Sequence, residues 1–175
     1  MKKLFAVVLF GAMSVATSYA QFGPTGTTNL NVNVVAEAAI RVDTANTNLI
    51  SAGSFANYLG TTNYTFKIRT TNGGGAGAVV VKISTDFAPA GGPTVGSGNL
   101  TYSCVVGAPV TGTGTACAGP VTATAADTSV ATFGNNTHSL GAGTGGSSVA
   151  WTLLNDAAYI TGSYTGVATF TISAS

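Results

Sequence analysis

The stretch that decides the fold is "NLNVNVVAEAAIRV", residues 29–42. Every even position in it is apolar, and most odd positions are polar. A period of two places alternate side chains on opposite faces of a β-strand, so the run predicts a strand over residues 30–43 with one buried face. That is about twice the usual strand length. The apolar positions are Leu30, Val32, Val34, Ala36, Ala38, Ile40 and Val42.

Shorter segments of the same kind follow along the chain, separated by Gly, Pro and Asn, which favour turns. In several of them the alternating apolar residues mark a buried face, and Trp151 is expected in the core for this reason. The segments predicted as strands are "ANYLG" (56–60), "NYTFKIRTT" (63–71), "GAVVVKISTDF" (77–87), "NLTYSCVV" (99–106), "PVTATAAD" (120–127), "SVATFG" (129–134), "SVAWTLL" (148–154) and "GSYTGVATFTISAS" (162–175).

Residues that favour helices are scarce, while Thr, Val, Gly and Asn abound. "LLNDAAY" (153–159) is at most a single helical turn. Parallel strands need long crossover connections, usually helices, and the sequence provides none. The predicted fold is therefore all-β: a mostly antiparallel, immunoglobulin-like β-sandwich formed by residues 30–175 as one domain.

The first twenty residues have the pattern of a secretory signal peptide. Lys2 and Lys3 precede the apolar run "LFAVVLFGAM", and "SYA" ends with small residues at the positions that a signal peptidase recognises. Cleavage is expected before Gln21, which leaves residues 21–29 as a short leader. The protein is thus expected to be secreted, at the cell surface or outside the cell, after passing through the periplasm.

Cys104 and Cys117 are the only cysteines. In an exported chain, two cysteines predict one disulfide bond. Closing a loop of about 15 residues is worth roughly 3 kcal/mol in the chain-entropy model. A metal site needs more ligands than two distant cysteines and one histidine, so no metal is expected.

Charged residues make up only 6% of the chain, against roughly 25% in ordinary domains. Residues 21–175 hold four basic and five acidic side chains, a formal charge of −1. This argues against nucleic acid and membrane surfaces as partners. So little charge favours a chain that packs against copies of itself, although a secreted monomer kept soluble by hydroxyl and amide groups fits the composition as well.

No group of residues predicts catalysis or a cofactor. "GAGTGG" (141–146) matches a dinucleotide-binding fingerprint in spacing, but a strand-like segment follows it where the fingerprint needs a helix. His138 has no nucleophile or orienting acid near it in sequence. Glu37 and Asp43 would lie about 20 Å apart on one strand, too far to act on one bond. The chain is expected to be non-enzymatic.

The layout of the chain resembles the chaperone–usher pilins and the related spore-coat-U-like secreted proteins. These are small exported β-sandwiches with few charges and an alternating N-terminal segment, similar to residues 29–42 here. They close with a glycine followed by alternating apolar residues, as residues 162–175 do. Two features depart from the pilin pattern: Ala174 stands where pilins usually have Tyr, and the cysteine pair lies in the middle of the chain.

The resemblance implies a pilus or fibre subunit, or an adhesin-like component, that assembles by β-strand addition. Residues 30–42 would be the donor strand, and Val32, Val34, Ala36 and Ala38 would enter a neighbour's groove. Copies of the chain or related subunits would be the partners, together with a periplasmic chaperone during transit. The edge of the acceptor groove would be formed by Tyr164, Ala168, Phe170 and Ile172.

Two alternatives stay open on the sequence alone. An ordinary first strand needs the same alternation, so residues 30–42 can equally pair within their own sandwich. A secreted carbohydrate- or ligand-binding module is the second functional hypothesis. It would expose several aromatic rings in a row, with Tyr58, Tyr64 and Tyr102 as candidates.

Overall fold

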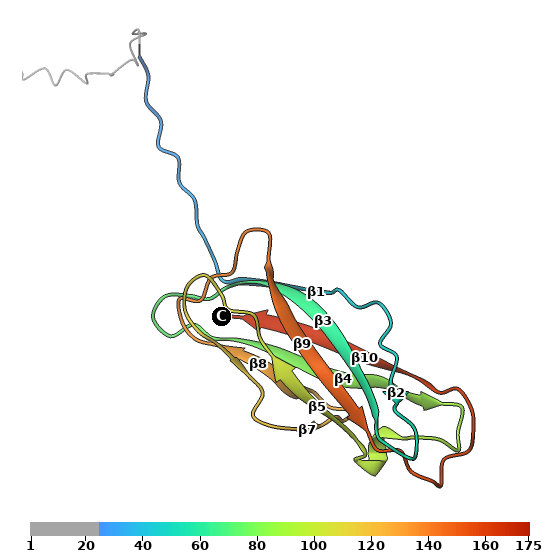
Figure 1. Ribbon diagram of the computed structural model, residues 1–175. Helices are drawn as coiled ribbons and strands as arrows, with labels where there is room; N and C mark the ends of the chain where they lie inside the picture. Colours follow the sequence, from blue (N-terminus) through green and yellow to red (C-terminus); the bar gives the residue numbers. More distant parts are fainter. Residues whose placement is uncertain (1–24) are drawn as a thin grey trace, which may run out of the picture. The chain divides into compact units, whose positions relative to one another are not determined.

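The alternating segments form two antiparallel sheets in the computed structural model, which describes residues 25–175 (Figure 1). The predicted signal peptide and the first residues after it lie outside the described part. Residues up to 33 and residues 34–175 are separate units, and each is described by itself. The strands are β1 (Glu37–Val42), β2 (Ile50–Ser51), β3 (Tyr58–Arg69), β4 (Gly77–Ala88), β5 (Leu100–Val105), β6 (Gly114–Ala116), β7 (Val121–Thr122), β8 (Thr128–Phe133), β9 (Thr144–Leu153) and β10 (Thr165–Ala174).

One sheet has the strand order β1-β3-β9-β5-β7, with β2 also paired to β3, and the other has the order β10-β4-β8-β6. Every pairing between these strands is antiparallel. Within the described residues the only helical element is the 3-10 turn η1 (Val95–Ser97). The predicted fold class, an all-β antiparallel sandwich with one disulfide, is confirmed.

Several predicted strand boundaries were wrong. The expected strand over residues 30–43 is paired only over Glu37–Val42. The segments at 56–60 and 63–71 merge into β3, and most of 120–127 is irregular apart from β7. The Gly- and Thr-rich loop between the cysteines contains β6, which the turn-like composition concealed.

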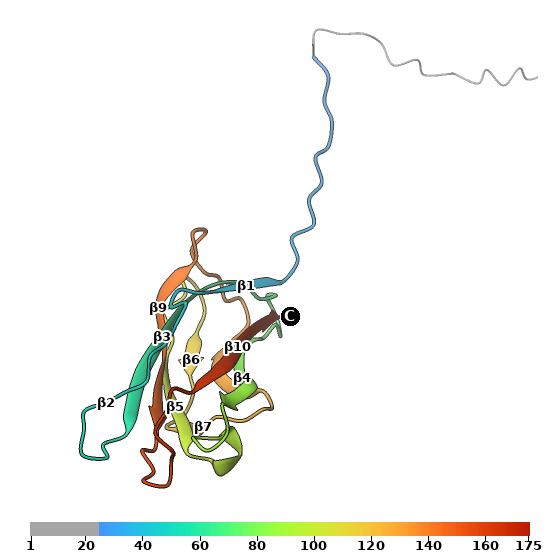
Figure 2. The ribbon, with the colours of Figure 1, turned by 90° about the vertical axis from the view of Figure 1, so that its right-hand side faces the viewer.

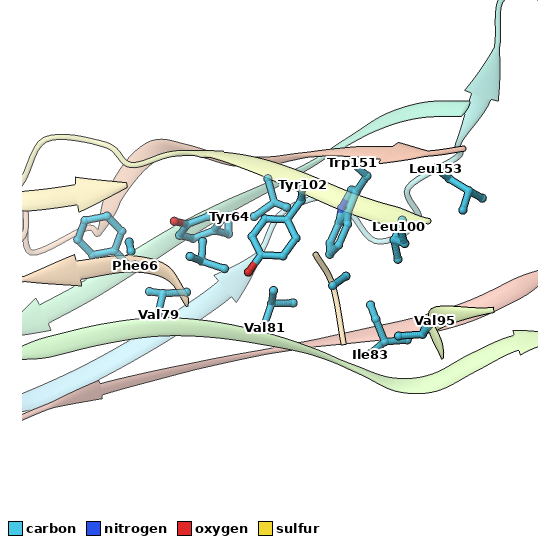
Figure 3. Packing of buried hydrophobic residues seen from close by; sticks show 14 of the residues in the cluster. Tyr64, Phe66, Val79, Val81, Ile83, Val95, Leu100, Tyr102, Trp151 and Leu153 are labelled. Carbon is cyan, nitrogen blue, oxygen red and sulfur yellow. The ribbon is translucent and has the colours of Figure 1, made fainter. Parts of the chain in front are cut away.

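The core lies between the sheets and consists of the inward-facing residues of both (Figure 3). Tyr64, Tyr102 and Trp151 supply the largest rings. The ring centroids of Tyr102 and Trp151 are 5.3 Å apart. Trp151 is buried as predicted, and its indole N–H donates a hydrogen bond to Thr62 Oγ1 at 2.9 Å.

The disulfide joins the two sheets. Cys104 lies on β5, whereas Cys117 directly follows β6 in the other sheet, where its N–H donates to the carbonyl of Val130 at 2.9 Å. The predicted Cys104–Cys117 pairing is confirmed. The bond thus restrains the chain between two edge regions of the sandwich, where β6 and β7 are only three and two residues long.

We expect the double variant C104S/C117S to unfold more easily by about 3 kcal/mol, because the unfolded chain regains the freedom of the open loop. Urea denaturation at neutral pH measures this difference. Reduction of the unmodified protein is the matched control and should lower the midpoint equally. An unchanged midpoint in both experiments would show that the bond contributes nothing to stability.

Two buried tyrosines differ in their hydrogen bonds. The Tyr102 hydroxyl donates to Thr128 Oγ1 or to the Ser129 carbonyl, at 2.8 and 2.9 Å. The Tyr64 hydroxyl is buried without a partner in hydrogen-bond geometry, although Ser147 lies close enough to influence it. Burial raises the pKa of Tyr64 to about 12, and the Ser147 hydroxyl opposes that rise only in part.

We therefore expect Y64F to leave the free energy of unfolding at pH 7 nearly unchanged, and Y102F to lower it by about 1 kcal/mol. Y64F removes a hydroxyl that has no hydrogen-bond partner, whereas Y102F removes a hydroxyl that donates to Thr128 or Ser129. Urea denaturation of both variants makes the comparison. Equal losses would contradict the assignment of Tyr64 as the unpaired group.

Alkaline pH provides a second test of Tyr64. Below pH 10 its hydroxyl is protonated in the folded and unfolded chains alike, so stability does not depend on it. Between pH 10 and about 12 the unfolded chain releases this proton before the folded chain does, so stability falls as pH rises. At about 1.36 kcal/mol per pH unit, we expect Y64F to remove roughly 2 kcal/mol of the loss that the unmodified protein shows over this range.

Candidate functional site

The two sides of the sandwich are closed differently. On one side, the disulfide links β5, the neighbour of edge strand β7, to the end of edge strand β6. On the other side, edge strands β1 and β10 lie near each other, as Figure 2 shows, but belong to different sheets and form no ladder. The β1/β10 side therefore has no covalent closure and exposes sheet edges.

Strand β10 is the open edge of its sheet. It pairs with β4 along its length, and no described strand pairs with its other edge. Its inward residues Phe170 and Ile172 are half-buried against the core, and the Phe170 ring lies 5.9 Å from the Tyr64 ring. Backbone groups along such an edge are available for pairing with another strand.

The four predicted groove residues do not all lie at this edge. Phe170 and Ile172 face the core from β10, as the alternation indicated. Ala168 is exposed, because the register shifts on both sides of Val167 break the alternation. Tyr164 precedes β10 and lies in the preceding loop, where its ring contacts Gly92 and its hydroxyl donates to the Ile160 carbonyl. The predicted burial of Ala168 was therefore wrong, and Tyr164 lies outside β10. The acceptor role of the four residues stays a prediction.

The predicted donor residues divide into two groups. Ala38, Ile40 and Val42 belong to β1 and pair in cis with β3, opposite Ile68, Phe66 and Tyr64. The residues before them form no strand, and we call residues 25–36 the arm. Within the arm Ala36 is half-buried, whereas the exposed fractions of Leu30, Val32 and Val34 are 91%, 86% and 61%. The cis alternative thus holds for residues 37–42.

Charged side chains mark the boundary between the arm and β1. Arg69 donates from Nε to the Val35 carbonyl at 2.8 Å and from Nη2 to the Glu37 carboxylate at 2.8 Å. Because both partners lie at the start of β1, this one guanidinium fixes which residue begins the strand. A slip of one residue would turn the apolar face of β1 to solvent.

The other end of β1 is held in a similar way. Asp43 accepts hydrogen bonds from Thr65 Oγ1 and Arg41 Nε, each at 2.6 Å. These two bonds, that from Thr65 first, lower the pKa of the Asp43 carboxyl. Five of the nine charged side chains in residues 21–175 lie on or next to β1 and the paired end of β3: Glu37, Arg41, Asp43, Lys67 and Arg69.

The remaining candidate residues are His138, the possible metal ligands and the "GAGTGG" segment. His138 is exposed, and its Nε2 lies 3.0 Å from Asn136 Oδ1, not beside a carboxylate. No group of three or more His, Cys, Asp or Glu side chains is placed to hold a metal ion in residues 25–175. "GAGTGG" leads directly into β9, so the helix that a dinucleotide site requires is not there.

The prediction that Tyr58, Tyr64 and Tyr102 form an exposed aromatic row for sugar binding was wrong. Tyr64 and Tyr102 are core residues, and Tyr58 is half-buried. Burial of two of the three rings leaves no flat aromatic platform from these residues. For Tyr64 the alternation with Phe66 and Ile68 already indicated a buried position.

Comparison with protein-family models, with curated proteins and with solved structures finds no match to this chain. In the described residues no helix is long and apolar enough to cross a bilayer. Inferences about function therefore rest on the arm, the open edge of β10 and the chemistry around them.

The hydrogen bonds from Arg69 to Val35 and Glu37 lead to a prediction. We expect R69M to raise the hydrogen-exchange rates of β1 amides about two- to threefold, since an exposed ion pair contributes little energy but here fixes a strand end. K67M is the matched control, because Lys67 forms no ion pair among the described residues. Equal hydrogen-exchange rates of the β1 amides in R69M and K67M would show that Arg69 does not hold the start of β1.

Proposed function

We propose that this protein is a non-enzymatic structural subunit of an extracellular fibre, assembled by β-strand addition. The arm of one copy would pair with the open edge of β10 in the next copy. The observation that carries this proposal is the arm itself: a regularly alternating apolar segment whose Leu30, Val32 and Val34 are exposed. Exposed apolar patches of this kind mark interaction surfaces.

The lengths of the two segments are compatible. The arm has twelve residues and β10 has ten. At about 3.3 Å per residue, both span roughly 33–40 Å as strands. Backbone pairing would provide the affinity, and pockets for alternate side chains would provide the specificity.

Burial of the arm would supply a substantial driving force. Each Val or Leu side chain moved from water into a core contributes about 1.5–3 kcal/mol. Leu30, Val32 and Val34 together would contribute roughly 4.5–9 kcal/mol before the cost of ordering the arm. Phe170 and Ile172, half-buried on β10, are the apolar surface that would meet them.

The geometry of the contact and the disulfide support the same proposal. Donor and acceptor are different surfaces, so the contact is head-to-tail and need not close. Copies of the chain or related subunits are the partners that an extended apolar strand would fit. A disulfide is typical of exported proteins, which supports an extracellular location.

We expect V32N/V34N to prevent polymer formation while leaving the sandwich folded, because both positions are exposed outside the paired strands. Light scattering and negative-stain microscopy of the mature protein measure the size of the assemblies. N31S/N33S, on the opposite face of the arm, is the matched control and should still polymerise. Filaments of normal length from V32N/V34N would rule out the arm as donor.

A synthetic peptide of residues 25–36 provides an independent test. It should occupy the edge of β10 and shorten or prevent the polymers, whereas the same peptide with Val32 and Val34 replaced by Asn should not. Isotope-edited NMR should locate the bound peptide beside β10. Binding elsewhere would contradict the acceptor assignment while leaving the donor assignment intact.

A further inference from the structure

The edge of β10 lacks the features that usually protect the edge of a sheet. Its ladder with β4 is unbroken from Ala168 to Ala174, and the register shifts all lie before Ala168. Residues 168–174 contain no charged side chain and no proline. Natural sheets block their edges with lysine, proline or bulges, because a free row of N–H and C=O groups pairs readily with another strand. This stretch of β10 is therefore ready to accept a partner strand.

The sequence of this edge is nearly the same in both directions. Residues 168–174 read "ATFTISA", with Thr171 at the centre. When two copies of β10 pair antiparallel about a two-fold axis at Thr171, each residue lies opposite the one equally far from Thr171 in the other copy. The opposed residues are then Ala168 and Ala174, Thr169 and Ser173, Phe170 and Ile172, and Thr171 with itself.

The opposed residues match in chemistry as well as in position. Phe170 opposite Ile172 is a pair of an aromatic and a β-branched side chain, and threonine opposite threonine or serine forms hydroxyl hydrogen bonds. Both kinds of pair stabilise an antiparallel ladder. Phe170 and Ile172 are half-buried on the core side, and the hydroxyl residues are exposed on the other face. A second copy of β10 therefore complements the edge on both faces.

The register about Thr171 pairs the whole unbroken stretch. Moving the axis to Phe170 would set Ala174 opposite Gly166, which lies among the register shifts, and would shorten the regular ladder. The complementarity thus favours one alignment of the two strands.

Neither charge nor ordering opposes this pairing. Among the β4 residues paired with Ala168–Ala174, only Lys82 is charged, and it lies opposite Thr169. The two copies of Lys82 would be about 20 Å apart, three strand spacings across and four residues along. Exposed charges at that separation are largely screened in physiological salt. Because β4 already holds β10 as a strand, the contact requires no segment to fold.

We propose that two copies of this protein pair through their β10 edges and form a two-fold symmetric dimer with a continuous sheet. The strand order β10-β4-β8-β6 of one copy would continue across the axis into that of the second copy. Both copies use the same surface, so the contact is isologous and closes. It does not depend on the arm. It uses the edge at which the arm is proposed to bind, so dimer formation would protect β10 from strand addition until the dimer dissociates.

Single cysteines test the contact and its register. In V32N/V34N protein, T171C places two thiols opposite each other at the axis, with Cβ atoms about 4.5–5.5 Å apart. Two thiols at position 169 would lie four residues apart along the paired strands, about 13 Å. We expect mild oxidation to link at least fivefold more T171C than T169C chains, and a mixture of T169C with S173C to restore the linkage. Equal linkage of T171C and T169C would overturn the proposal.

A charge at the axis provides an independent test. T171K would set two lysines directly opposite each other, which destabilises a ladder. In V32N/V34N protein, sedimentation equilibrium should show a dissociation constant raised at least tenfold by T171K. The matched control T132K adds the same charge at an exposed position of β8, away from the edge of β10, and should change the constant less than twofold.

Two results would contradict the dimer: V32N/V34N protein that stays monomeric at every concentration, or equal effects of T171K and T132K. The intact arm serves to separate this proposal from strand addition. Linkage of T171C that is equally strong with the intact arm and with V32N/V34N would support the dimer and count against strand addition to β10.

Discussion

Burial of one face of every long strand is the constraint on which the rest of this structure depends. The two sheets meet through Tyr64 and Phe66 on β3, Val79 and Val81 on β4, and Trp151 on β9. In residues 25–175 the two ion pairs, Arg41–Asp43 and Arg69–Glu37, both lie at the surface, so neither defines the interior. The period of two along most of β3 and over parts of β4 and β9 therefore determines which faces pack together.

The uneven closure of the sandwich follows from how its edge strands are made. β6 and β7 are too short to hold an edge by pairing, and the disulfide near them compensates for this. β1 and β10 are longer, with six and ten residues, and pair with β3 and β4 along their length, so their side is held without a covalent bond. The same length leaves a long open edge on β10, and this is the feature that gives the proposed assembly its acceptor.

The sequence predicted the fold class, the disulfide and the core position of Trp151, because alternation and cysteine count carry that information directly. It did not predict where β1 begins, since residues 30–36 and 37–42 alternate equally well. The difference comes from Arg69, more than thirty residues away in sequence, which bonds Val35 and Glu37. The register shifts beside Val167 likewise depend on tertiary contacts that a one-dimensional pattern does not contain.

The absence of glycine and proline between Leu30 and Val42 has a mechanical consequence. In a fibre built by the proposed strand addition, the strand held by the next subunit would continue into β1 without a glycine or proline between them. Tension along such a fibre would pass directly into the six-residue ladder between β1 and β3 and load its hydrogen bonds in shear, all at once. The hydrogen bonds from Arg69 to Val35 and Glu37 lie where that load would enter the domain. The start of β1 would then set both the bending stiffness of the fibre and the force at which it breaks.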